Sequence, residues 1–395
     1  MLDFSPLRTW EITDMAKIGQ AVSYYMGLMS GTSLDGIDAA VIRMSDNDIE
    51  LVHFNTYPIP NKLKEPILHL NQPSYHEIDT MGVLDRELGL AFANAALHTM
   101  TEAGLEPAQI KAIGSHGQTI RHRPQGIGNS LPFTLQIGDA ATIAEKTGIT
   151  VVSDFRKRDI AACGQGAPLV PFVHQRLFAR RDKHVAVVNI GGIANITYLD
   201  ADGTVSGFDT GPGNMVMDAL MQTMTDARFC YDEGGELAAS GHVYQPLLDD
   251  LLKHPFFKIT PPRSTGREDF GEDVVHHIMA VDIPDADKMA TACELTVRSI
   301  ADSLQFLPHK PDVWYLCGGG ALNIHLRQRL KDVLDAPVQT TADVGLPVEA
   351  VEAVAFAVLA ERTIMGERNV LSSVTGALHD VCAGTITPGA NWQRV

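Results

Sequence analysis

Short apolar runs separated by small polar residues characterise the start of the chain. Residues 24–29 and 37–44 flank the loop 30–36, which is built of small, hydroxyl-bearing and acidic residues around one leucine. Residues 49–57 follow and are rich in β-branched and aromatic side chains. Alternation of such runs with glycine-containing turns predicts three consecutive strands.

The same order of runs returns in the middle of the chain. Residues 184–190 and 193–199 are apolar runs on either side of Gly191-Gly192, and the run 205–208 leads to a helical stretch at 214–224. Strand, glycine turn, strand, turn, strand and helix therefore occur twice, which indicates a structural duplication.

Further elements are predicted between and after the two repeats. Apolar residues recur every four positions from Leu84 to Ala96, which predicts a helix that ends at Gly104. Short buried strands are expected at 110–113, 133–137, 149–152 and 313–316, and an apolar helix at 351–363.

The length of the chain favours two domains, because 395 residues exceed one ordinary hydrophobic core. The prediction is an α/β protein with an interdomain cleft. Residues 1–20 are expected to form an N-terminal extension. Residues 21–154, completed by the C-terminal segment 370–395, are expected to form domain I, and residues 155–369 domain II.

Composition and charge narrow the class of partner. The chain is 45% hydrophobic and carries a formal net charge of −17. An acidic surface repels the phosphates of nucleic acids and of anionic membranes, so neither is an expected partner, whereas a nucleotide can still be held locally by backbone N–H groups. The five scattered cysteines, the absence of a secretory signal and the shortness of the longest apolar run, 353–360, predict a soluble cytoplasmic protein.

The loop after the first strand is the first candidate for chemistry. Gly31 and Gly36 let the backbone approach a ligand, and Thr32 and Ser33 offer hydroxyl and N–H donors to a phosphate. Two acids in the same stretch, Asp35 and Asp38, could hold Mg²⁺ directly or through water. An ordinary hairpin turn is the alternative interpretation of this loop alone. A P-loop, a dinucleotide fingerprint, a zincin motif and a nucleophile elbow are all missing from the sequence.

Seven motifs in order resemble those of the anhydro-N-acetylmuramic acid kinases, in the superfamily of actin, sugar kinases and Hsp70. They are MSGTSLDGID (29–38), GSHGQTI (114–120), DFRKRD with GQGAPLVP (154–171), NIGGIANIT (189–197), GFDTGPGN (207–214), STGRE (264–268) and CGGGALN (317–323). The resemblance covers nearly the whole chain from about residue 24. It implies two ribonuclease H-like domains with an interdomain cleft.

The activity that this resemblance implies belongs to peptidoglycan recycling. Such kinases take 1,6-anhydro-N-acetylmuramic acid, water and ATP with Mg²⁺, and form N-acetylmuramic acid 6-phosphate and ADP. Water opens the anhydro bridge at C1 while the freed O6 attacks the γ-phosphate. Two rival functions are a kinase of an ordinary hexose or N-acetyl sugar and a non-catalytic module that senses nucleotide and sugar. A homodimer is one compatible oligomeric state.

The resemblance also assigns roles to individual residues. Asp209 matches the catalytic base, although an Asp before Gly-Pro-Gly would otherwise be interpreted as a turn residue. Arg158 and Glu352 match positions that contact the sugar; a solvated surface arginine and a helix-stabilising acid are the alternatives. His116 and Gln118 are weaker candidates for substrate contact, because a lone His is more often structural. The ATP contacts that it implies are Gly31, Thr32, Ser33, Leu34, Asp35, Gly36, Ile37, Asp38, Gly191, Gly192, Gly318, Gly319 and Gly320.

Overall fold

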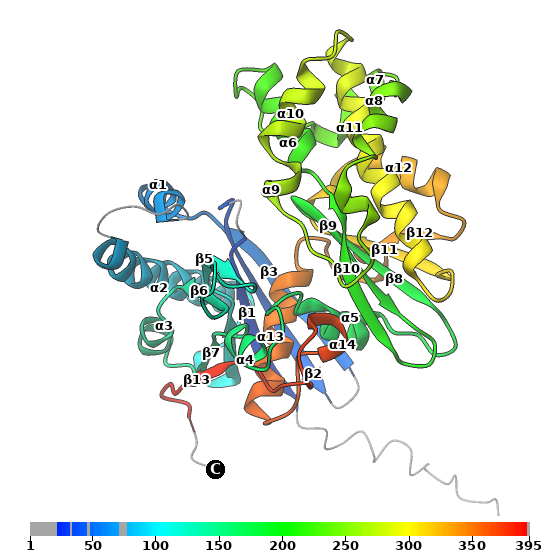
Figure 1. Ribbon diagram of the computed structural model, residues 1–395. Coiled ribbons are helices and arrows are strands. Elements are labelled where there is room, and N and C mark those ends of the chain that lie inside the picture. Colours follow the sequence, from blue (N-terminus) through cyan, green and yellow to red (C-terminus); the bar gives the residue numbers. More distant parts are fainter. Residues whose placement is uncertain (1–21, 32–33, 46–47, 71–76, 393–395) are drawn as a thin grey trace, which may run out of the picture.

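The protein consists of two lobes, each built on one β-sheet, in the computed structural model shown in Figure 1. The structure describes residues 22–31, 34–45, 48–70 and 77–392. Thr32, Ser33 and the expected N-terminal extension therefore lie outside the described residues.

The first sheet has the strand order β13-β7-β4-β1-β2-β3 in the described part of the chain. β1, β2 and β3 form the predicted antiparallel meander, and β4 and β7 continue the sheet in parallel with β1. The strands are β1 (Ser23–Met29), β2 (Ile37–Ser45), β3 (Asp48–Tyr57), β4 (Ile110–Ser115), β7 (Val151–Ser153) and β13 (Thr385–Thr387).

The second sheet repeats this arrangement with the order β10-β9-β8-β11-β12. β8, β9 and β10 form an antiparallel meander, and β11 and β12 lie parallel to β8. The duplication predicted from the sequence is thus confirmed, and its topology is that of the two-domain actin-like fold. The strands are β8 (Val185–Ile190), β9 (Ile193–Leu199), β10 (Val205–Pro212), β11 (Val313–Cys317) and β12 (Val338–Thr340).

Helices cover the outer face of each sheet (Figure 1). The first lobe carries α1 (Asn61–Leu70), α2 (Glu77–Glu102), α3 (Ala140–Thr147) and α4 (Lys157–Ala161), with the separate hairpin β5 (Gln118–Arg123) and β6 (Phe133–Ile137). The second lobe carries α6 (Met215–Met224), α7 (Glu236–Ser240), α8 (Gln245–Leu251), α9 (Arg267–Phe270), α10 (Glu272–Met279), α11 (Asp285–Ala301) and α12 (Ile324–Val333). Short 3₁₀ helices lie at Pro107–Gln109, Glu233–Gly235, Pro255–Lys258, Asp302–Phe306, Gly319–Leu322 and Thr341–Val344.

One helix from late in the chain, α13 (Val351–Ile364), covers the inner face of the first sheet. It packs so closely that a Cβ on Gly27 of β1 would lie 1.8 Å from the carbonyl oxygen of Ala353, and one on Gly114 of β4 would lie 2.0 Å from that of Phe356. Glycine is therefore required at both strand positions. The expected domain II, 155–369, included this helix, whereas its packing joins it to the first lobe.

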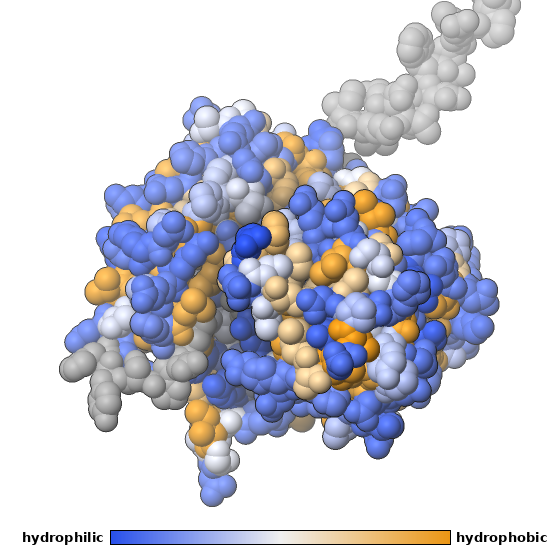
Figure 2. Space-filling view, turned by 90° about the horizontal axis from the view of Figure 1, so that it is seen from above, coloured by the Kyte–Doolittle hydropathy of each residue, from blue (hydrophilic) through white to orange (hydrophobic). Residues whose placement is uncertain are grey.

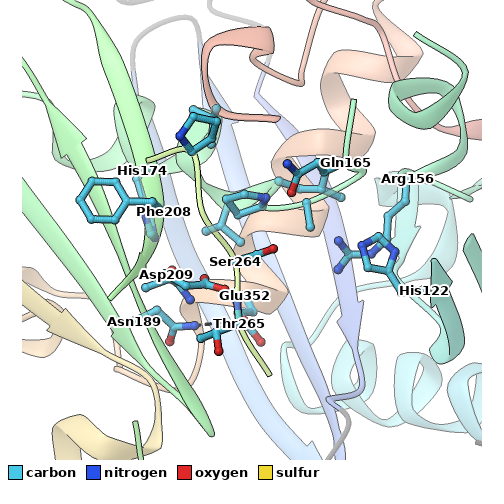
Figure 3. A pocket seen from close by; sticks show the side chains of 18 of the residues that line it. His122, Arg156, Gln165, His174, Asn189, Phe208, Asp209, Ser264, Thr265 and Glu352 are labelled. Carbon is cyan, nitrogen blue, oxygen red and sulfur yellow. Dashed lines mark hydrogen bonds between the residues drawn. The ribbon is translucent and has the colours of Figure 1, made fainter. Parts of the chain in front are cut away.

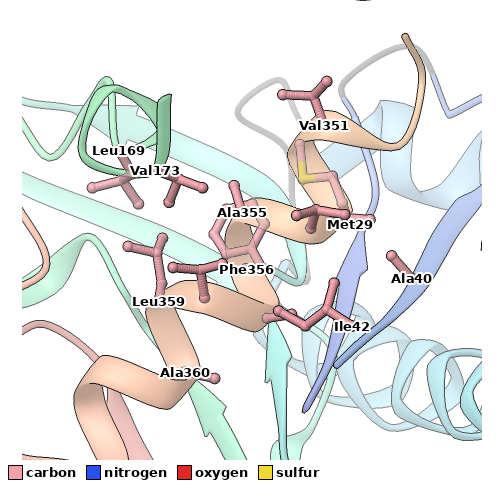
Figure 4. Close-up of a cluster of buried hydrophobic side chains, with 14 of the residues drawn as sticks. Met29, Ala40, Ile42, Leu169, Val173, Val351, Ala355, Phe356, Leu359 and Ala360 are labelled. Carbon is pink, nitrogen blue, oxygen red and sulfur yellow. The ribbon is translucent and has the colours of Figure 1, made fainter. Parts of the chain in front are cut away.

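One shared hydrophobic cluster occupies part of the space between the two sheets (Figure 4). Val351, Phe356 and Leu359 of α13 meet Ile42 of β2 and Val173 of α5 (Val170–Phe178) there, and α5 in turn lies on the second sheet. Because residues from both lobes bury each other in this cluster, α13 and α5 join the lobes. The short helix α14 (Ser372–Thr375) lies against β10 of the second lobe.

Hydrophilic side chains dominate the face in Figure 2, where hydrophobic residues form scattered patches. Among the described residues, no helix is both long and apolar enough to cross a membrane.

Candidate active site

A cavity of about 420 Å³ lies between the lobes and collects residues from motifs far apart in the sequence (Figure 3). Asp209 and Asn189 come from the second sheet, Glu352 from the start of α13, and Arg156 and His122 from the first lobe. The segment 262–265 and Glu268 close one side. Apolar side chains such as Met29, Phe208 and Phe356 form the rest of the wall.

Asp209 lies within β10, at a break in the regular pairing with β9. The register shifts between Asp209 and Gly211, and Gly211 has φ of +155°, a backbone conformation that favours glycine. The sequence interpretation placed Asp209 at a strand end; the strand instead continues to Pro212 through this bulge. A bulge redirects the side chain while both flanking segments stay paired, so the carboxylate is presented from within the edge strand β10.

One carboxylate oxygen of Asp209 is fixed and the other has no partner among the described residues. The backbone N–H of Thr265 donates to Oδ2 at 2.9 Å. Burial raises the pKa of Asp209 to about 6, and the Thr265 N–H and the Arg263 charge oppose that rise. A carboxyl group with a pKa near 6 is a stronger base than an ordinary Asp and is still ionised at neutral pH.

Glu352 faces the same cavity from the first turn of α13, as Figure 3 shows. Asn189 Nδ2 donates to its Oε1 at 3.4 Å. Burial, followed by the nearby charge of Asp38, raises the pKa of Glu352, whereas Arg156 acts in the opposite direction. Asp209 and Glu352, the two acids that the sequence assigned to catalysis and to the sugar, are thus brought into one site.

Arg156, and not Arg158, brings a guanidinium group into the cavity. Arg156 caps the start of α4, whereas Arg158 lies two residues further along that helix and therefore points to another side. The exposed Arg158 donates from Nη1 to the backbone carbonyl of Cys382 at 3.1 Å. The sequence interpretation selected Arg158, whereas the arginine of this motif that lines the cavity is Arg156.

His116 supports Arg156 and does not line the main cavity. The Nε2 atom of His116 accepts hydrogen bonds from Arg156 Nε at 3.2 Å and Nη2 at 2.9 Å, while its Nδ1 lies 2.8 Å from the carbonyl of Gly117. Burial, reinforced by the charge of Arg156, lowers the pKa of His116 to about 3. The neutral imidazole thus orients the arginine, which is a structural use of a histidine expected to contact substrate.

Gln118 forms hydrogen bonds with the first residues of the candidate phosphate loop. Its buried side chain accepts a hydrogen bond from Ser30 Oγ at 2.7 Å and donates to the carbonyl of Gly31 at 3.3 Å. Both contacts lie where β1 ends and the loop begins. Gln118 therefore fixes the departure of the loop, and it does not line the cavity with Asp209.

The glycine turn of the second lobe packs on the start of α6. The N–H groups of Gly213 and Asn214 donate to the carbonyls of Gly192 and Gly191 at 2.8 and 2.7 Å. A Cβ on Gly213 would lie 2.2 Å from the carbonyl oxygen of Gly191, so this approach requires glycine. Gly192 itself is exposed and free of such crowding.

The triple glycine after β11 has two different uses. A Cβ on Gly318 would lie 2.4 Å from Asn189 Oδ1, and one on Gly320 would lie 2.3 Å from the Ile190 side chain. These two glycines therefore allow the turn to pack against β8. Only Gly319 of the three is exposed and has open space around it, which leaves bare backbone for a ligand.

Acidic groups face each other near the candidate phosphate loop. Burial raises the pKa of Asp218 on α6 to about 7, and the charge of Asp35 adds to the rise. Burial also raises the pKa of Asp38, whose carboxylate accepts a hydrogen bond from Thr56 Oγ1 at 2.6 Å. Uncompensated negative charge of this kind suits a bound cation. In the described part of the chain, however, no three acidic, His or Cys side chains are gathered as a preformed metal site.

Comparisons with known proteins agree with this geometry. The family model described as anhydro-N-acetylmuramic acid kinase matches residues 23–389. An anhydro-N-acetylmuramic acid kinase of Shewanella loihica is 45% identical over 371 residues, which cover 93% of this chain and 99% of that protein. One of Vibrio parahaemolyticus is 45% identical over 356 residues, covering 89% and 95% respectively.

Among solved structures, the activator of the 2-hydroxyisocaproyl-CoA dehydratase from Clostridium difficile with bound ADPNP aligns with a TM-score of 0.44 and 11% identity. The alignment covers 88% of this chain and 99% of that one. The family match and the curated relatives span almost the whole chain and include every motif that contributes to the cavity. This chain belongs to the anhydro-N-acetylmuramic acid kinase family.

Proposed function

We propose that this protein phosphorylates 1,6-anhydro-N-acetylmuramic acid with ATP while hydrolysing the anhydro bridge, and forms N-acetylmuramic acid 6-phosphate and ADP. The observation that carries the proposal is Asp209. Its carboxylate faces the cavity between the lobes from a strand bulge, with Oδ2 held by the Thr265 N–H and Oδ1 without a partner among the described residues. An ordinary hexose kinase needs no base for a hydrolytic water.

In this mechanism Asp209 acts as the general base. Its free Oδ1 accepts a proton from a water molecule, and the water oxygen bonds to C1 of the sugar. The bond between C1 and the bridging oxygen breaks, and that oxygen, now O6, forms a bond to the γ-phosphorus as the bond to the ADP oxygen breaks. The elevated pKa of Asp209 suits proton acceptance near neutral pH.

We assign the recognition of the lactyl carboxylate to Arg156. The guanidinium group has five N–H donors. Contacts with His116 and with the carbonyl of Gly166 hold it in place through Nε, Nη1 and Nη2, and further N–H groups remain for a planar carboxylate. Glu352, on the opposite side of the cavity in Figure 3, suits a sugar hydroxyl or amide N–H.

We place the ATP phosphates between the loop 31–38 of the first lobe and Gly191-Gly192 of the second. Exposed backbone at Gly192 and Gly319 offers N–H groups without steric hindrance. Mg²⁺, which neutralises developing charge on the phosphates, would be held through Asp35 and Asp38 with Asp218 facing them, since their mutual repulsion is relieved by a cation.

Closure of the two lobes would complete the site. For this purpose we divide the molecule at the expected boundary after residue 154, but assign α13 to the first lobe because it packs on the first sheet. Closure brings Asp209 of one lobe to the phosphate loop of the other and excludes the water that would hydrolyse ATP unproductively. We place the enzyme in the cytoplasm because it consumes ATP.

The decisive experiment uses isotopically labelled water. The protein is incubated with Mg-ATP and the anhydro sugar in ¹⁸O water, and the 6-phosphorylated product is analysed by mass spectrometry. Label at C1 is the expected result. Unlabelled product would contradict hydrolytic opening. N-acetylmuramic acid without the anhydro bridge serves as the comparison substrate, and faster ADP release with it would favour an ordinary sugar kinase.

A further inference from the structure

A short segment of the second lobe lies directly over Asp209 and is tied to it at both backbone and side chain. The Asp209 N–H donates to the carbonyl of Arg263 at 3.2 Å, and two residues later the Thr265 N–H donates to Asp209 Oδ2 at 2.9 Å. We name residues 262–265 the strap. Its backbone fixes both the position of Asp209 in the bulge and the rotation of its carboxylate.

Arg263 attaches the strap to the strand with its guanidinium group. Nε donates to the carbonyl of Asp209 at 2.9 Å and Nη2 to the carbonyl of Thr210 at 3.3 Å, while Nη1 donates to the carbonyl of Ile259 at 3.1 Å. The carbonyls of Asp209 and Thr210 lie at the break in the β9–β10 pairing, where an irregular strand leaves acceptors without ladder partners. The side chain is only 7% exposed.

Three aromatic rings surround the same guanidinium group. Its central carbon lies 4.6 Å from the ring centre of Phe256, 4.8 Å from Phe306 and 5.5 Å from Phe208. The rings belong to three different elements, namely two 3₁₀ helices and β10. A buried cation held by rings and carbonyls cannot change direction without losing several contacts together.

The carbonyl contacts alone would make Arg263 a structural residue of the lobe. Its position next to the base gives it a second effect. The Arg263 charge lies close enough to favour the ionised form of Asp209 and so opposes the rise in its pKa that burial causes. The geometry that holds the strap therefore also sets the electrostatic environment of the base.

We propose that Arg263 is the positioning residue for Asp209, which clamps the strap on the bulge so that Thr265 fixes Oδ2 and leaves Oδ1 to accept the proton from water. The proposal rests on the proposed function for the identity of the reaction. It adds the oxygen atom that reacts and the residue that keeps it in place.

Several other charged or titratable groups face Asp209 across the cavity and belong in any account of its pH dependence. Glu268 follows the strap, Glu352 starts α13, Arg156 precedes α4, and two histidines, His122 of β5 and His174 of α5, line the wall. Burial lowers the pKa of His122 to about 4 and that of His174 to about 3. Neither histidine therefore changes its charge between pH 5 and 8.

The first test compares Arg263→Met with Arg263→Lys in steady-state kinetics over pH 5 to 9. Arg263→Met removes the charge and all three hydrogen bonds, and kcat should fall on the order of 10- to 100-fold, because small misplacements of a reacting group have effects of that size. The KM for ATP should not change. The acidic limb of the kcat profile should move to higher pH. Arg263→Lys keeps the positive charge among the rings, so its kcat and the position of its acidic limb should stay close to those of the wild type.

Arg180→Met is the matched control. Arg180 likewise lies over an aromatic ring, 5.8 Å from the centre of Tyr315, and donates to the Tyr315 hydroxyl, but it does not line the cavity. Its replacement should leave the acidic limb in place. Loss of kcat in Arg263→Met without movement of that limb would show a purely structural role and overturn the proposal, as would an unchanged kcat.

A second test needs no catalysis and so separates this proposal from the proposed function. Thermal unfolding is measured at pH 8 for Arg263→Lys and Arg263→Met, each alone and combined with Asp209→Asn. If the Arg263 charge acts on the ionised Asp209, Arg263→Met lowers the unfolding temperature more in the presence of Asp209 than together with Asp209→Asn, whereas Arg263→Lys, which keeps the charge, does so to a smaller extent. Equal effects of Arg263→Met in both backgrounds would refute the coupling. If Arg263→Met does not fold, Arg263→Gln, which also removes the charge, gives the same comparison.

Discussion

Replacement of the proposed base should abolish activity and at the same time stabilise the protein. Asp209→Asn keeps the shape of the side chain and an oxygen that can accept from the Thr265 N–H. It removes a carboxylate that is ionised in a largely buried site. Activity should be lost because an amide cannot take a proton from water.

The size of the stabilisation follows from the pKa of Asp209. Burial raises that pKa from 3.8 to about 6, so the folded state holds its proton more tightly than the unfolded state. The ionised group consequently destabilises the fold by up to about 3 kcal/mol above pH 6, since each pH unit corresponds to about 1.4 kcal/mol. An amide also has to be desolvated, and we therefore expect a gain of about 1 to 3 kcal/mol.

The sign of the pH dependence makes this prediction specific. In the wild-type protein the destabilising effect is absent below about pH 4, grows as the pH rises towards 6 and then stays constant. The difference in unfolding temperature between Asp209→Asn and wild type should follow the same course. Calorimetry at pH 4, 5, 6 and 8 measures it.

A surface aspartate provides the control. Asp202 lies in the turn between β9 and β10, and hydrogen bonds from Thr204 lower its pKa. Asp202→Asn should therefore not raise the unfolding temperature at pH 8. If Asp209→Asn showed no stabilisation at pH 8, or a gain of equal size at pH 4 and pH 8, the assignment of Asp209 as a buried ionised base would be wrong.

Three further variants test other parts of the site and fold. Arg156→Met should lower kcat/KM for the anhydro sugar by about 10- to 100-fold through loss of charge-assisted hydrogen bonds, while Arg158→Met should leave it nearly unchanged; a larger effect of the second variant would reverse our assignment. Asp218→Asn should raise the Mg²⁺ concentration needed for half-maximal activity in a metal titration, and an unchanged requirement would exclude Asp218 from the cation site. Gly114→Ala should destabilise the protein by about 1 to 3 kcal/mol in thermal unfolding because its Cβ meets α13, whereas Gly82→Ala, which has open space in α2, should be neutral or stabilising.

The sequence predicted the two sheets for physical reasons that act locally, whereas the role proposed for Asp209 came from the resemblance to a family and not from the neighbouring residues. Apolar runs separated by glycine-containing turns specify each meander almost by themselves, and the strand limits agree within a few residues. The bulge at Asp209 was not predicted, because it depends on where the pairing with β9 breaks.

The errors concern side-chain direction and long-range packing. Arg156 and Arg158 lie two residues apart at the start of a short helix, and their side chains therefore point in different directions around its axis. The neighbouring motifs do not indicate which of the two directions faces the cavity. Burial and the charge of Arg156, forty residues away in the chain, together lower the pKa of His116. The position of α13 could not be inferred from its neighbours in sequence, because the sheet that it covers is formed by residues before 154.

The packing of α13 has a consequence for the order in which the protein is made. The inner face of the first sheet exposes Tyr25, Ile42 and Ala112 until residues 351–364 have left the ribosome. The N-terminal lobe, although synthesised first, therefore cannot finish folding before the C-terminal helix arrives, while most of the second lobe can. For most of its synthesis the nascent chain thus exposes an apolar sheet surface that α13 covers only at the end. We expect chaperones to bind the nascent chain at this surface.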